Sequence, residues 1–244
     1  MSFERNIKRI SGFAAAFIIF FLASGTYLSL KGFEMSPDGK IALVNEAIAE
    51  PEAKTEAKAE KPLNVVINNE KQHVLGNPDA PVTIYEYSSF GCSHCAAFHV
   101  FTLPYIKKDF IDTGKVKLIF VDFPLDKRSM QASLLSYCIP ANDYFDYLTL
   151  IFKKQREWSM GFNPEKNFIE YAGLFGVSKE KAQACLKNED IQTEIMSKRQ
   201  NAIKELNIQG TPAFLVTNGL QQELMQGAPE FEAMSEVINS MLKK

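Results

Sequence analysis

The pattern of apolar and polar positions divides the chain into three regions. Residues 12–30 are 19 uncharged residues, mostly Phe, Ile, Leu and Ala, and they follow a start that carries three basic residues against one acid. Residues 50–62 contain only Glu, Lys, Ala, Pro and one Thr, a composition that cannot build a core. From there onward, apolar residues recur at the spacings of strands and helices. We therefore expect one folded domain at 63–244.

Within this domain, the periodicity predicts strands and helices in a definite order. Runs rich in β-branched and aromatic residues predict five strands, at 64–68, 82–87, 116–123, 212–217 and 220–226. Helical spacing predicts helices at 92–114 with a kink at Pro104, at 127–207 in segments broken by Pro140, Pro164, Gly173 and Gly176, and at 229–242. Asn218-Gly219 predicts a two-residue hairpin between the last two strands. This order implies an α/β fold with a mixed central sheet and a helical insertion at about 127–207.

The first 30 residues have the composition of an export signal. A basic start followed by an uncharged apolar run directs a chain across a membrane. Ala23-Ser24-Gly25 offers small residues at a suitable processing site, whereas 19 uncharged residues nearly suffice to span a bilayer, which takes about 20. We expect 1–30 to be a cleaved signal peptide or an N-terminal membrane anchor rather than a buried core helix. In either case the part after Leu30 is carried across, with 31–62 as a polar linker.

Charge and cysteine content exclude several classes of protein. The formal net charge is −2, and residues 1–30 contribute +2 (three bases, one acid), so the remainder carries −4. Such a chain lacks the clustered Lys and Arg of a nucleic-acid-binding surface. Four cysteines are too few for a small disulfide-stapled protein, so apolar burial must hold the core. The placement of each cysteine is therefore informative.

The motif Gly91-Cys92-Ser93-His94-Cys95 lies where a predicted strand turns into a predicted helix. A cysteine at a helix N-terminus faces unpaired backbone N–H groups and the positive end of the helix dipole, which lower its pKa from about 8.5. Cys92 occupies this position. His94 can add a hydrogen bond or positive charge to the same thiolate, which stabilises the reduced form and makes the disulfide a stronger oxidant. Cys95 would be the buried resolving partner.

Other uses of a Cys-x-x-Cys pair fit this sequence less well. Haem attachment needs a His directly after the second Cys, and Ala96 stands there. A zinc site needs four ligands, whereas Cys92, Cys95 and His99 supply three. A purely structural disulfide across four residues would close little chain entropy. We expect a site for thiol–disulfide exchange that uses no metal and no cofactor.

The cysteine motif, together with several other segments of the chain, resembles the pattern of a known family. Over about residues 72–243 the sequence is similar to the DsbA-type thiol:disulfide oxidoreductases of bacterial cell envelopes, which have a thioredoxin-like fold. The resemblance rests on the segment 75–82, the cysteine motif, Gly210-Thr211-Pro212 and the helical insertion. It implies a cis peptide at Thr211-Pro212 beside the cysteines, where the Thr211 backbone can pair with an extended substrate. Otherwise Pro212 would be an ordinary strand-start residue.

The resemblance also gives roles to residues whose pattern is ambiguous. Glu86 shares its side of a predicted strand with β-branched residues, where a carboxylate is unusual, and by resemblance it would shuttle the proton of Cys95 during exchange. Cys138 and Cys185 lie in apolar helical contexts, where free buried cysteines are common. An oxidising compartment and the second disulfide of some family members favour a Cys138–Cys185 bridge.

Three further side chains receive ordinary interpretations. His73 is expected to be a surface residue that precedes a strand. His99, one turn after Cys95, is expected to cover or cap a helix face rather than bind a metal. Trp158, the only tryptophan, is expected to pack inside the helical insertion.

The sequence is therefore interpreted as an exported thiol:disulfide oxidoreductase that introduces disulfide bonds into exported proteins with free cysteines. A substrate thiolate would attack Cys92, and a second substrate thiol would resolve the mixed disulfide. By resemblance, a membrane quinone-linked reoxidase of DsbB-like or VKOR-like type would restore the disulfide. The alternatives are a disulfide isomerase or reductase with the same site, and a non-catalytic thioredoxin-fold binding module. The expected location is the periplasm or another extracytoplasmic envelope space.

Overall fold

The structure is a computed structural model that describes residues 33–35, 41–43 and 73–243. The chain divides into two units, residues 1–59 and 60–244, and each is described by itself. In the first unit, β1 (Phe33–Met35) and β2 (Ile41–Leu43) pair antiparallel within the segment predicted to be a linker. The predicted export signal and the predicted strand at 64–68 lie outside the described residues. None of the helices in the described part of the chain is long and apolar enough to cross a membrane.

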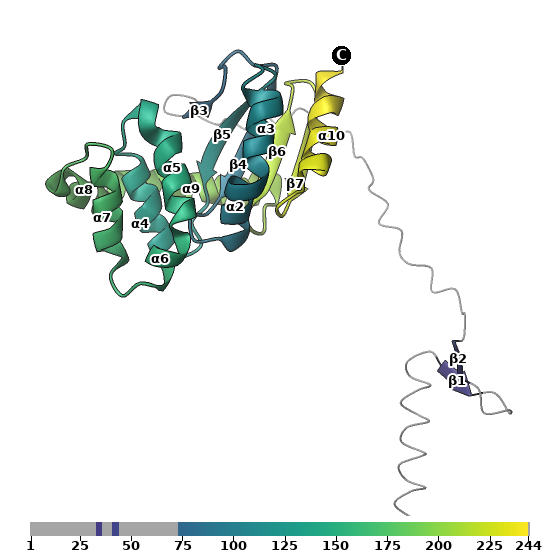
Figure 1. Cartoon of the computed structure of the whole chain (residues 1–244), viewed down its shortest axis with the longest axis horizontal. Helices are drawn as coiled ribbons and strands as arrows, with labels where there is room; N and C mark the ends of the chain where they lie inside the picture. Colours follow the sequence, from purple (N-terminus) through teal and green to yellow (C-terminus); the bar gives the residue numbers. More distant parts are fainter. Residues whose placement is uncertain (1–32, 36–40, 44–72, 244) are drawn as a thin grey trace, which may run out of the picture. The chain divides into compact units, whose positions relative to one another are not determined.

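A mixed five-stranded sheet forms the centre of the second unit (Figure 1). Its strands are β3 (Val74–Leu75), β4 (Val82–Ser88), β5 (Val116–Asp122), β6 (Ala213–Thr217) and β7 (Gln222–Gln226). They lie in the order β3-β5-β4-β6-β7. The central strand β4 pairs parallel with β5 and antiparallel with β6. The last four strands agree with the prediction to within two residues, whereas the two-residue β3 is too short for its pattern to predict it.

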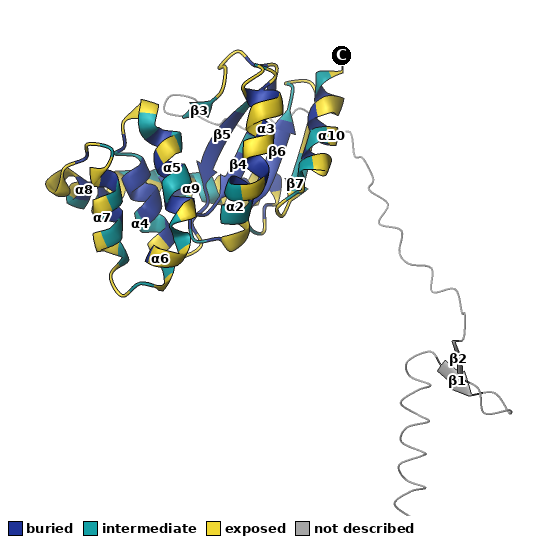
Figure 2. Ribbon diagram, viewed as in Figure 1, coloured by how far each residue is buried: buried dark blue, intermediate teal, exposed yellow. Residues whose placement is uncertain are grey.

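Helices cover both faces of the sheet, and the central strands β4, β5 and β6 between them are largely buried (Figure 2). The helices on the sheet are α2 (Ser93–Ala97), the π-helical segment η2 (Phe98–Thr102), α3 (Leu103–Ile106), the π-helical segment η3 (Lys107–Ile111), α9 (Glu189–Leu206) and α10 (Phe231–Leu242). Ile84 and Phe214 point to the face covered by the run from α2 to η3 and by α10. Val121 and Leu215 point to the opposite face, where they pack with Leu206 of α9. The centre of the sheet is therefore covered on both faces, since successive side chains along a strand point to opposite faces.

The helical insertion extends over residues 127–206, from α4 to α9, within one residue of the predicted range. Its other elements are α4 (Lys127–Ser136), the 3-10 turn η4 (Ala141–Asp143), α5 (Tyr144–Lys153), α6 (Gln155–Met160), α7 (Pro164–Gly173) and α8 (Lys179–Leu186). Trp158 is buried there and donates its indole N–H to the Ile151 carbonyl oxygen at 2.9 Å. The expectation for Trp158 is thus confirmed. The same apolar cluster includes Cys92 and Cys95, so the insertion packs directly on the cysteine pair.

The helices of the insertion are interrupted at Pro164, as predicted. α6 ends at Met160, and Pro164 begins α7, where its missing N–H has no cost and Asn163 caps the helix.

One local prediction is wrong. Asn218-Gly219 does not form a two-residue hairpin, because the loop between β6 and β7 spans residues 218–221. The Asn218 side-chain oxygen accepts the backbone N–H groups of the third and fourth loop residues, at 3.0 and 2.8 Å, and holds this wider turn.

Candidate active site

Cys92 and Cys95 lie at the junction between β4 and α2. Cys92 is the N-cap residue of α2, and its Sγ accepts the backbone N–H of Cys95 at 3.4 Å. Both cysteines are free, so the structure shows the dithiol form. Cys92 is 9% exposed and Cys95 is fully buried. The pair therefore has an outer sulfur that a partner could approach and an inner sulfur enclosed by the core.

The surroundings separate the pKa values of the two thiols. The pKa of Cys92 is lowered to about 5, chiefly because the Cys95 thiol donates a hydrogen bond to it, while burial acts in the opposite direction. The backbone N–H groups of Cys95 and His94 lower it further. The pKa of Cys95 is raised, chiefly by burial and also by its hydrogen bond to Cys92. At neutral pH the dithiol therefore carries one thiolate, on Cys92, and the thiolate is the form in which a cysteine can act as a nucleophile.

His94 acts on Cys92 through its backbone. Its N–H contributes to the lowered pKa of Cys92, as expected of a residue in the first turn of a helix. Its imidazole is exposed and makes no hydrogen bond to any residue that the structure describes. Stabilisation of the thiolate by the imidazole itself stays a prediction.

The Thr211-Pro212 peptide lies beside Cys92 and is cis. The Thr211 carbonyl oxygen is 3.3 Å from Cys92 Sγ, although 119 residues separate the two in sequence. Pro212 leads into β6, and the pairing of β6 with β4 brings both loops to the same end of the sheet. A chain that binds along this loop would therefore lie next to the reactive sulfur.

Glu86 and His99 form a buried pair beneath the helix that carries the cysteines. Glu86 lies on β4, in register with Phe120 and Phe214 of the neighbouring strands, and is fully buried. Both of its carboxylate oxygens lie within hydrogen-bond distance of His99 Nε2, at 2.9 and 3.0 Å. Glu86 makes no hydrogen bond to Cys95, so its role as a proton shuttle stays a prediction. His99 was expected on a helix face, and its direct contact with the buried acid was missed.

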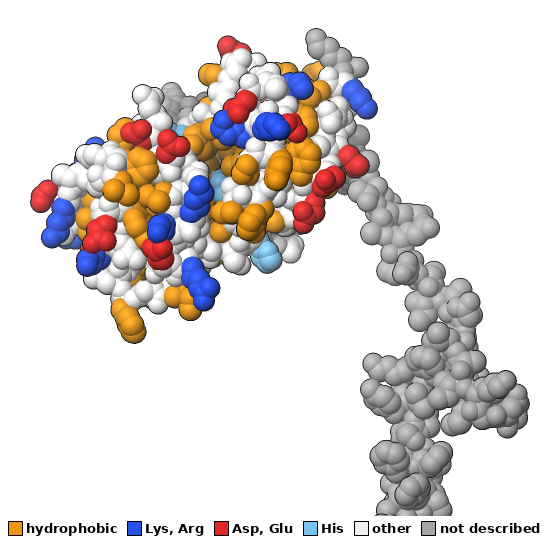
Figure 3. All heavy atoms as spheres, in the orientation of Figure 1, with side chains coloured by type: hydrophobic (Ala, Val, Ile, Leu, Met, Phe, Trp, Pro, Cys, Tyr) orange, Lys and Arg blue, Asp and Glu red, His pale blue; other side chains and the backbone are white. Residues whose placement is uncertain are grey.

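Pro104 shapes the helix that carries Cys95 and His99. Proline has no backbone N–H, and its ring clashes with the carbonyl of residue i−4 in a regular α-helix. The expected kink takes the form of a wider turn, η2, in which the Leu103 N–H bonds the Phe98 oxygen, and the helix continues. Its outer side exposes aromatic residues, and apolar side chains gather over α3 (Figure 3). π-helical turns of this kind often occur at functional sites.

The helical insertion meets the cysteine loop through close packing. A Cβ atom at Gly91 would overlap the Ser129 hydroxyl in the first turn of α4, so a larger residue at this position would have to displace that side chain. From α5, the ring of Phe152 stacks on that of His99, with centroids 4.2 Å apart, and also contacts Phe90. The loop before the reactive cysteine is thus held between two helices of the insertion.

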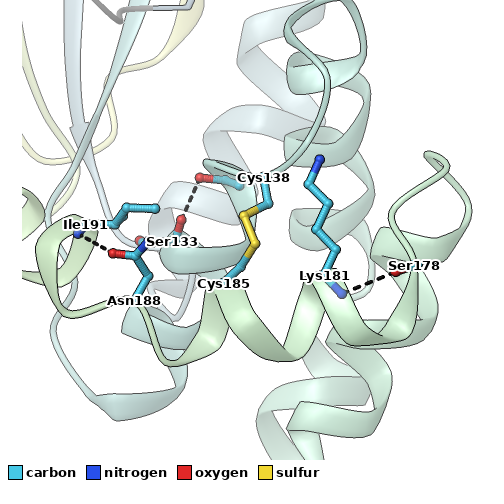
Figure 4. Close-up of a disulfide and its surroundings, with 8 residues drawn as sticks. Ser133, Cys138, Ser178, Lys181, Cys185, Asn188 and Ile191 are labelled. Atoms are coloured by element: carbon cyan, nitrogen blue, oxygen red, sulfur yellow. Dashed lines mark hydrogen bonds between the residues drawn. A yellow bond between two sulfur atoms is a disulfide. The ribbon is translucent and has the colours of Figure 1, made fainter.

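A disulfide joins Cys138 and Cys185 within the insertion (Figure 4). Cys138 follows α4 and Cys185 lies on α8, and their Cα atoms are 6.4 Å apart. The bridge spans 47 residues of sequence and is distinct from the free pair at the active site. The bridge is a covalent link between the end of α4 and α8, which the polypeptide chain itself joins only by way of α5, α6 and α7.

A second buried acid, Asp122, ends β5. It lines a small cavity together with His73, Tyr137, Tyr144 and Lys198. Burial raises the pKa of Asp122 to about 6, although the nearby charge of Lys198 acts in the opposite direction. His73 is half-buried and stacks on Tyr144 with ring centroids 3.8 Å apart, so it is not the free surface residue expected. The described residues contain no group of three or more His, Cys, Asp or Glu side chains arranged to hold a metal ion.

Comparison with known proteins places this geometry in a family. The family model described as "Thioredoxin" matches residues 68–240, which is more than half of the chain. A protein of Rickettsia bellii that is named as a protein-disulfide oxidoreductase is 31% identical over 184 residues, covering 75% of this chain and 70% of that one. Disulfide bond formation protein D of Bacillus subtilis is 30% identical over 183 residues, covering 70% and 78%. This chain is a DsbA-type member of the thioredoxin family.

A solved structure of a DsbA protein supports the assignment of this chain to the DsbA type. The crystal structure of Wolbachia pipientis alpha-DsbA1 matches with a TM-score of 0.66 and 30% identity, covering 71% of this chain and 92% of that one. The fold expected from the sequence, a thioredoxin-like mixed sheet with a helical insertion, is confirmed, and the protein is a protein-disulfide oxidoreductase. The chain spans only 53 to 65% of the length of four further Rickettsia relatives.

Proposed function

We propose that this DsbA-type enzyme acts as an oxidant, which donates the Cys92–Cys95 disulfide to exported proteins. The observation that supports this direction is the pKa of Cys92, which lies at about 5 in the dithiol form. A stabilised thiolate lowers the free energy of the reduced enzyme and so makes its disulfide a stronger oxidant. The buried Cys95 remains protonated and does not compete as a nucleophile.

The proposed reaction consists of two thiol–disulfide exchanges. A substrate thiolate attacks Cys92 Sγ, the Cys92–Cys95 bond breaks, and Cys95 leaves with the electron pair and takes up a proton. A second substrate thiolate then attacks the substrate sulfur that is bonded to Cys92, and Cys92 leaves as a thiolate. The substrate gains a disulfide and loses two electrons, and the enzyme gains them as a dithiol.

Cys95 needs a proton source because burial raises its pKa. Glu86 is buried beneath α2, and its partner His99 lies one helical turn from Cys95. In the proposed mechanism Glu86 gives its proton to Cys95 when the enzyme disulfide breaks, which leaves Glu86 as the carboxylate, and Glu86 takes a proton back from Cys95 when the disulfide forms again. His99 keeps the carboxyl group in place through both steps.

The proposed substrates are exported proteins that are still unfolded and have free cysteines. An extended backbone can lie along the cis Thr211-Pro212 loop beside the outer sulfur. Phe101 and Tyr105 are 70% and 59% exposed on the outer side of the cysteine helix, which suits apolar segments of an unfolded chain. Turnover requires an oxidant for the dithiol, and the proposed one is a membrane quinone-linked reoxidase of DsbB-like or VKOR-like type.

The proposed location is the periplasm or another extracytoplasmic envelope space. The apolar segment after the basic start would direct the chain across a membrane, either as a cleaved signal or as an anchor. A structural disulfide such as Cys138–Cys185 persists in oxidising compartments, which supports the same location.

The reduction potential of the Cys92–Cys95 pair tests the direction of the reaction. We expect a value well above the roughly −270 mV of a cytosolic reductant such as thioredoxin, and nearer to about −120 mV. The oxidised protein should also oxidise a reduced, unfolded test protein, and a Cys92→Ser variant should not. A potential near that of thioredoxin would favour a reductase. Equal behaviour of the wild type and the variant would favour a binding module.

A further inference from the structure

Gln155 reaches from the helical insertion to the backbone of the cysteine loop. Its Nε2 donates to the carbonyl oxygen of Phe90 at 2.7 Å and to that of Cys92 at 2.8 Å. These two oxygens lie on either side of Gly91. Because 63 residues separate Gln155 from Cys92, the contact is made by the tertiary fold and not by the local chain.

The two carbonyl groups differ in what else they can bond. Phe90 is fully buried, so its carbonyl oxygen is shut off from water and must find a partner inside the protein. The Cys92 oxygen already accepts the Ala96 N–H at 3.1 Å, the first hydrogen bond of the helix, and Gln155 occupies its second acceptor position. One amide group therefore fixes the backbone on both sides of the glycine that precedes the nucleophile.

The orientation of this loop controls the nucleophile. The N-cap conformation of Cys92 aims the backbone N–H of Cys95 at its sulfur, and the N–H of His94 acts on the same sulfur. A loop that could rotate about Gly91 would lose these donors in part of its conformations. Holding both carbonyls keeps the sulfur at the N-terminus of α2.

The donor itself is rigidly placed. Gln155 begins α6, two residues after α5 ends. Phe152, near the end of α5, packs on Phe90 with ring centroids 5.3 Å apart. Trp158, within α6, is 1% exposed. The residues before and after Gln155 are thus packed in the core, so the backbone that carries its side chain is held in place beside the cysteine loop.

We propose that Gln155 is a positioning residue for Cys92, through which the helical insertion sets the reactivity of the outer sulfur. The role rests on the proposed exchange chemistry and adds to it a residue that does not touch the reacting sulfur. It also gives the insertion a part in catalysis beyond packing.

A Gln155→Met variant tests the proposal, because methionine has a similar length but no donor and no charge. We expect the pKa of Cys92, followed by thiolate absorbance of the reduced protein, to rise. The rate at which the oxidised protein oxidises a dithiol peptide should fall about tenfold, the size expected for one or two lost hydrogen bonds. The reduction potential should fall in parallel. A Gln155→Lys variant, which restores N–H donors, should move all three values back.

Gln200→Met is the matched control, because Gln200 is exposed on α9 and should leave all three values unchanged. A Gln155→Met protein with a wild-type Cys92 titration and a rate within about twofold of wild type would overturn the proposal, even if it unfolded more easily. If the wild type failed to oxidise the peptide, the proposed function would fail, whereas the Cys92 titration would still decide the role of Gln155.

Discussion

The His99 ring bridges both carboxylate oxygens of Glu86 through one nitrogen, Nε2, at 2.9 and 3.0 Å, and neither side chain is more than 1% exposed. The pair joins the central strand to the helix that follows the cysteines. Removing one partner of a buried pair leaves the other without compensation, which costs about 3–5 kcal/mol. The pair is therefore expected to matter for stability as well as for proton transfer.

We predict that His99→Leu lowers the free energy of unfolding by about 3 kcal/mol, measured by urea denaturation of the oxidised protein. The double variant Glu86→Leu with His99→Leu should recover part of this loss, because no polar group is then left unpaired. A loss of less than about 1 kcal/mol in the single variant would show that Glu86 finds another partner.

Glu86→Gln should slow disulfide exchange by about tenfold or more, because glutamine keeps the shape of the side chain but cannot carry the proton of Cys95. Stopped-flow measurement of one turnover with a dithiol peptide gives the rate. Glu223→Gln, on the exposed strand β7, serves as the control. An unchanged rate in Glu86→Gln would remove the proton role from Glu86.

The lowered pKa of Cys92 predicts a pH-dependent stability of the reduced protein. The pKa falls from 9.0 to about 5 on folding, so between these values the unfolded chain binds a proton that the folded protein does not. The free energy of unfolding should therefore rise with pH through this window, by up to about 1.4 kcal/mol per pH unit. Below pH 5 the thiol is protonated in both states, and Cys92 contributes nothing to stability through its ionisation. Reduced Cys92→Ser should lack this slope. Equal slopes in the two proteins would contradict the lowered pKa.

The Cys138–Cys185 bridge closes a loop across 47 residues of sequence. Replacing both cysteines by serine should lower the free energy of unfolding by about 4 kcal/mol through the larger entropy of the unfolded chain. Thiol titration of the oxidised, denatured wild type should find no free thiol. Two free thiols there would refute the bridge.

Asp122 predicts the opposite pH trend from Cys92. Its pKa rises from 3.8 to about 6 because burial disfavours the charged form, so between these values the folded protein binds more protons than the unfolded chain. The contribution of Asp122 to stability therefore falls as the pH rises through this window. Asp122→Asn should be more stable than the wild type by up to roughly 3 kcal/mol at pH 7, and the difference should vanish below about pH 3. A difference that does not depend on pH would contradict the raised pKa.

Local features of the site could be predicted from the sequence, because a short segment determines them. Two cysteines one helical turn apart, directly after an apolar strand, specify a helix N-terminus and its effect on a thiol. The helical insertion is also evident, since no strand pattern interrupts residues 127–206. The adjacency of Thr211 to Cys92 needed the family resemblance, because nothing in the residues between them shows which loops meet.

The parts that could not be predicted depend on tertiary packing. His99 lies one helical turn after Cys95, and this spacing does not show that its ring contacts Glu86. The sequence around Pro104 also does not distinguish a wide π-helical turn from a kink. Gln155 is an ordinary polar residue at the start of a helix until the insertion folds over the cysteine loop.

The close approach of α4 to Gly91 means that the helical insertion is not a separate module attached to the thioredoxin core. An insertion joined to a domain only at its two ends could be excised to leave a minimal thioredoxin. Here Ser129 fills the space beside Gly91, and Phe152 covers Phe90, so residues 127–206 supply one wall of the catalytic loop. Excision would open that wall to water and remove the Gln155 donor from the carbonyl oxygens of Phe90 and Cys92. The inserted helices and the thioredoxin core therefore form the cysteine loop together, and the loop is complete only when both are present.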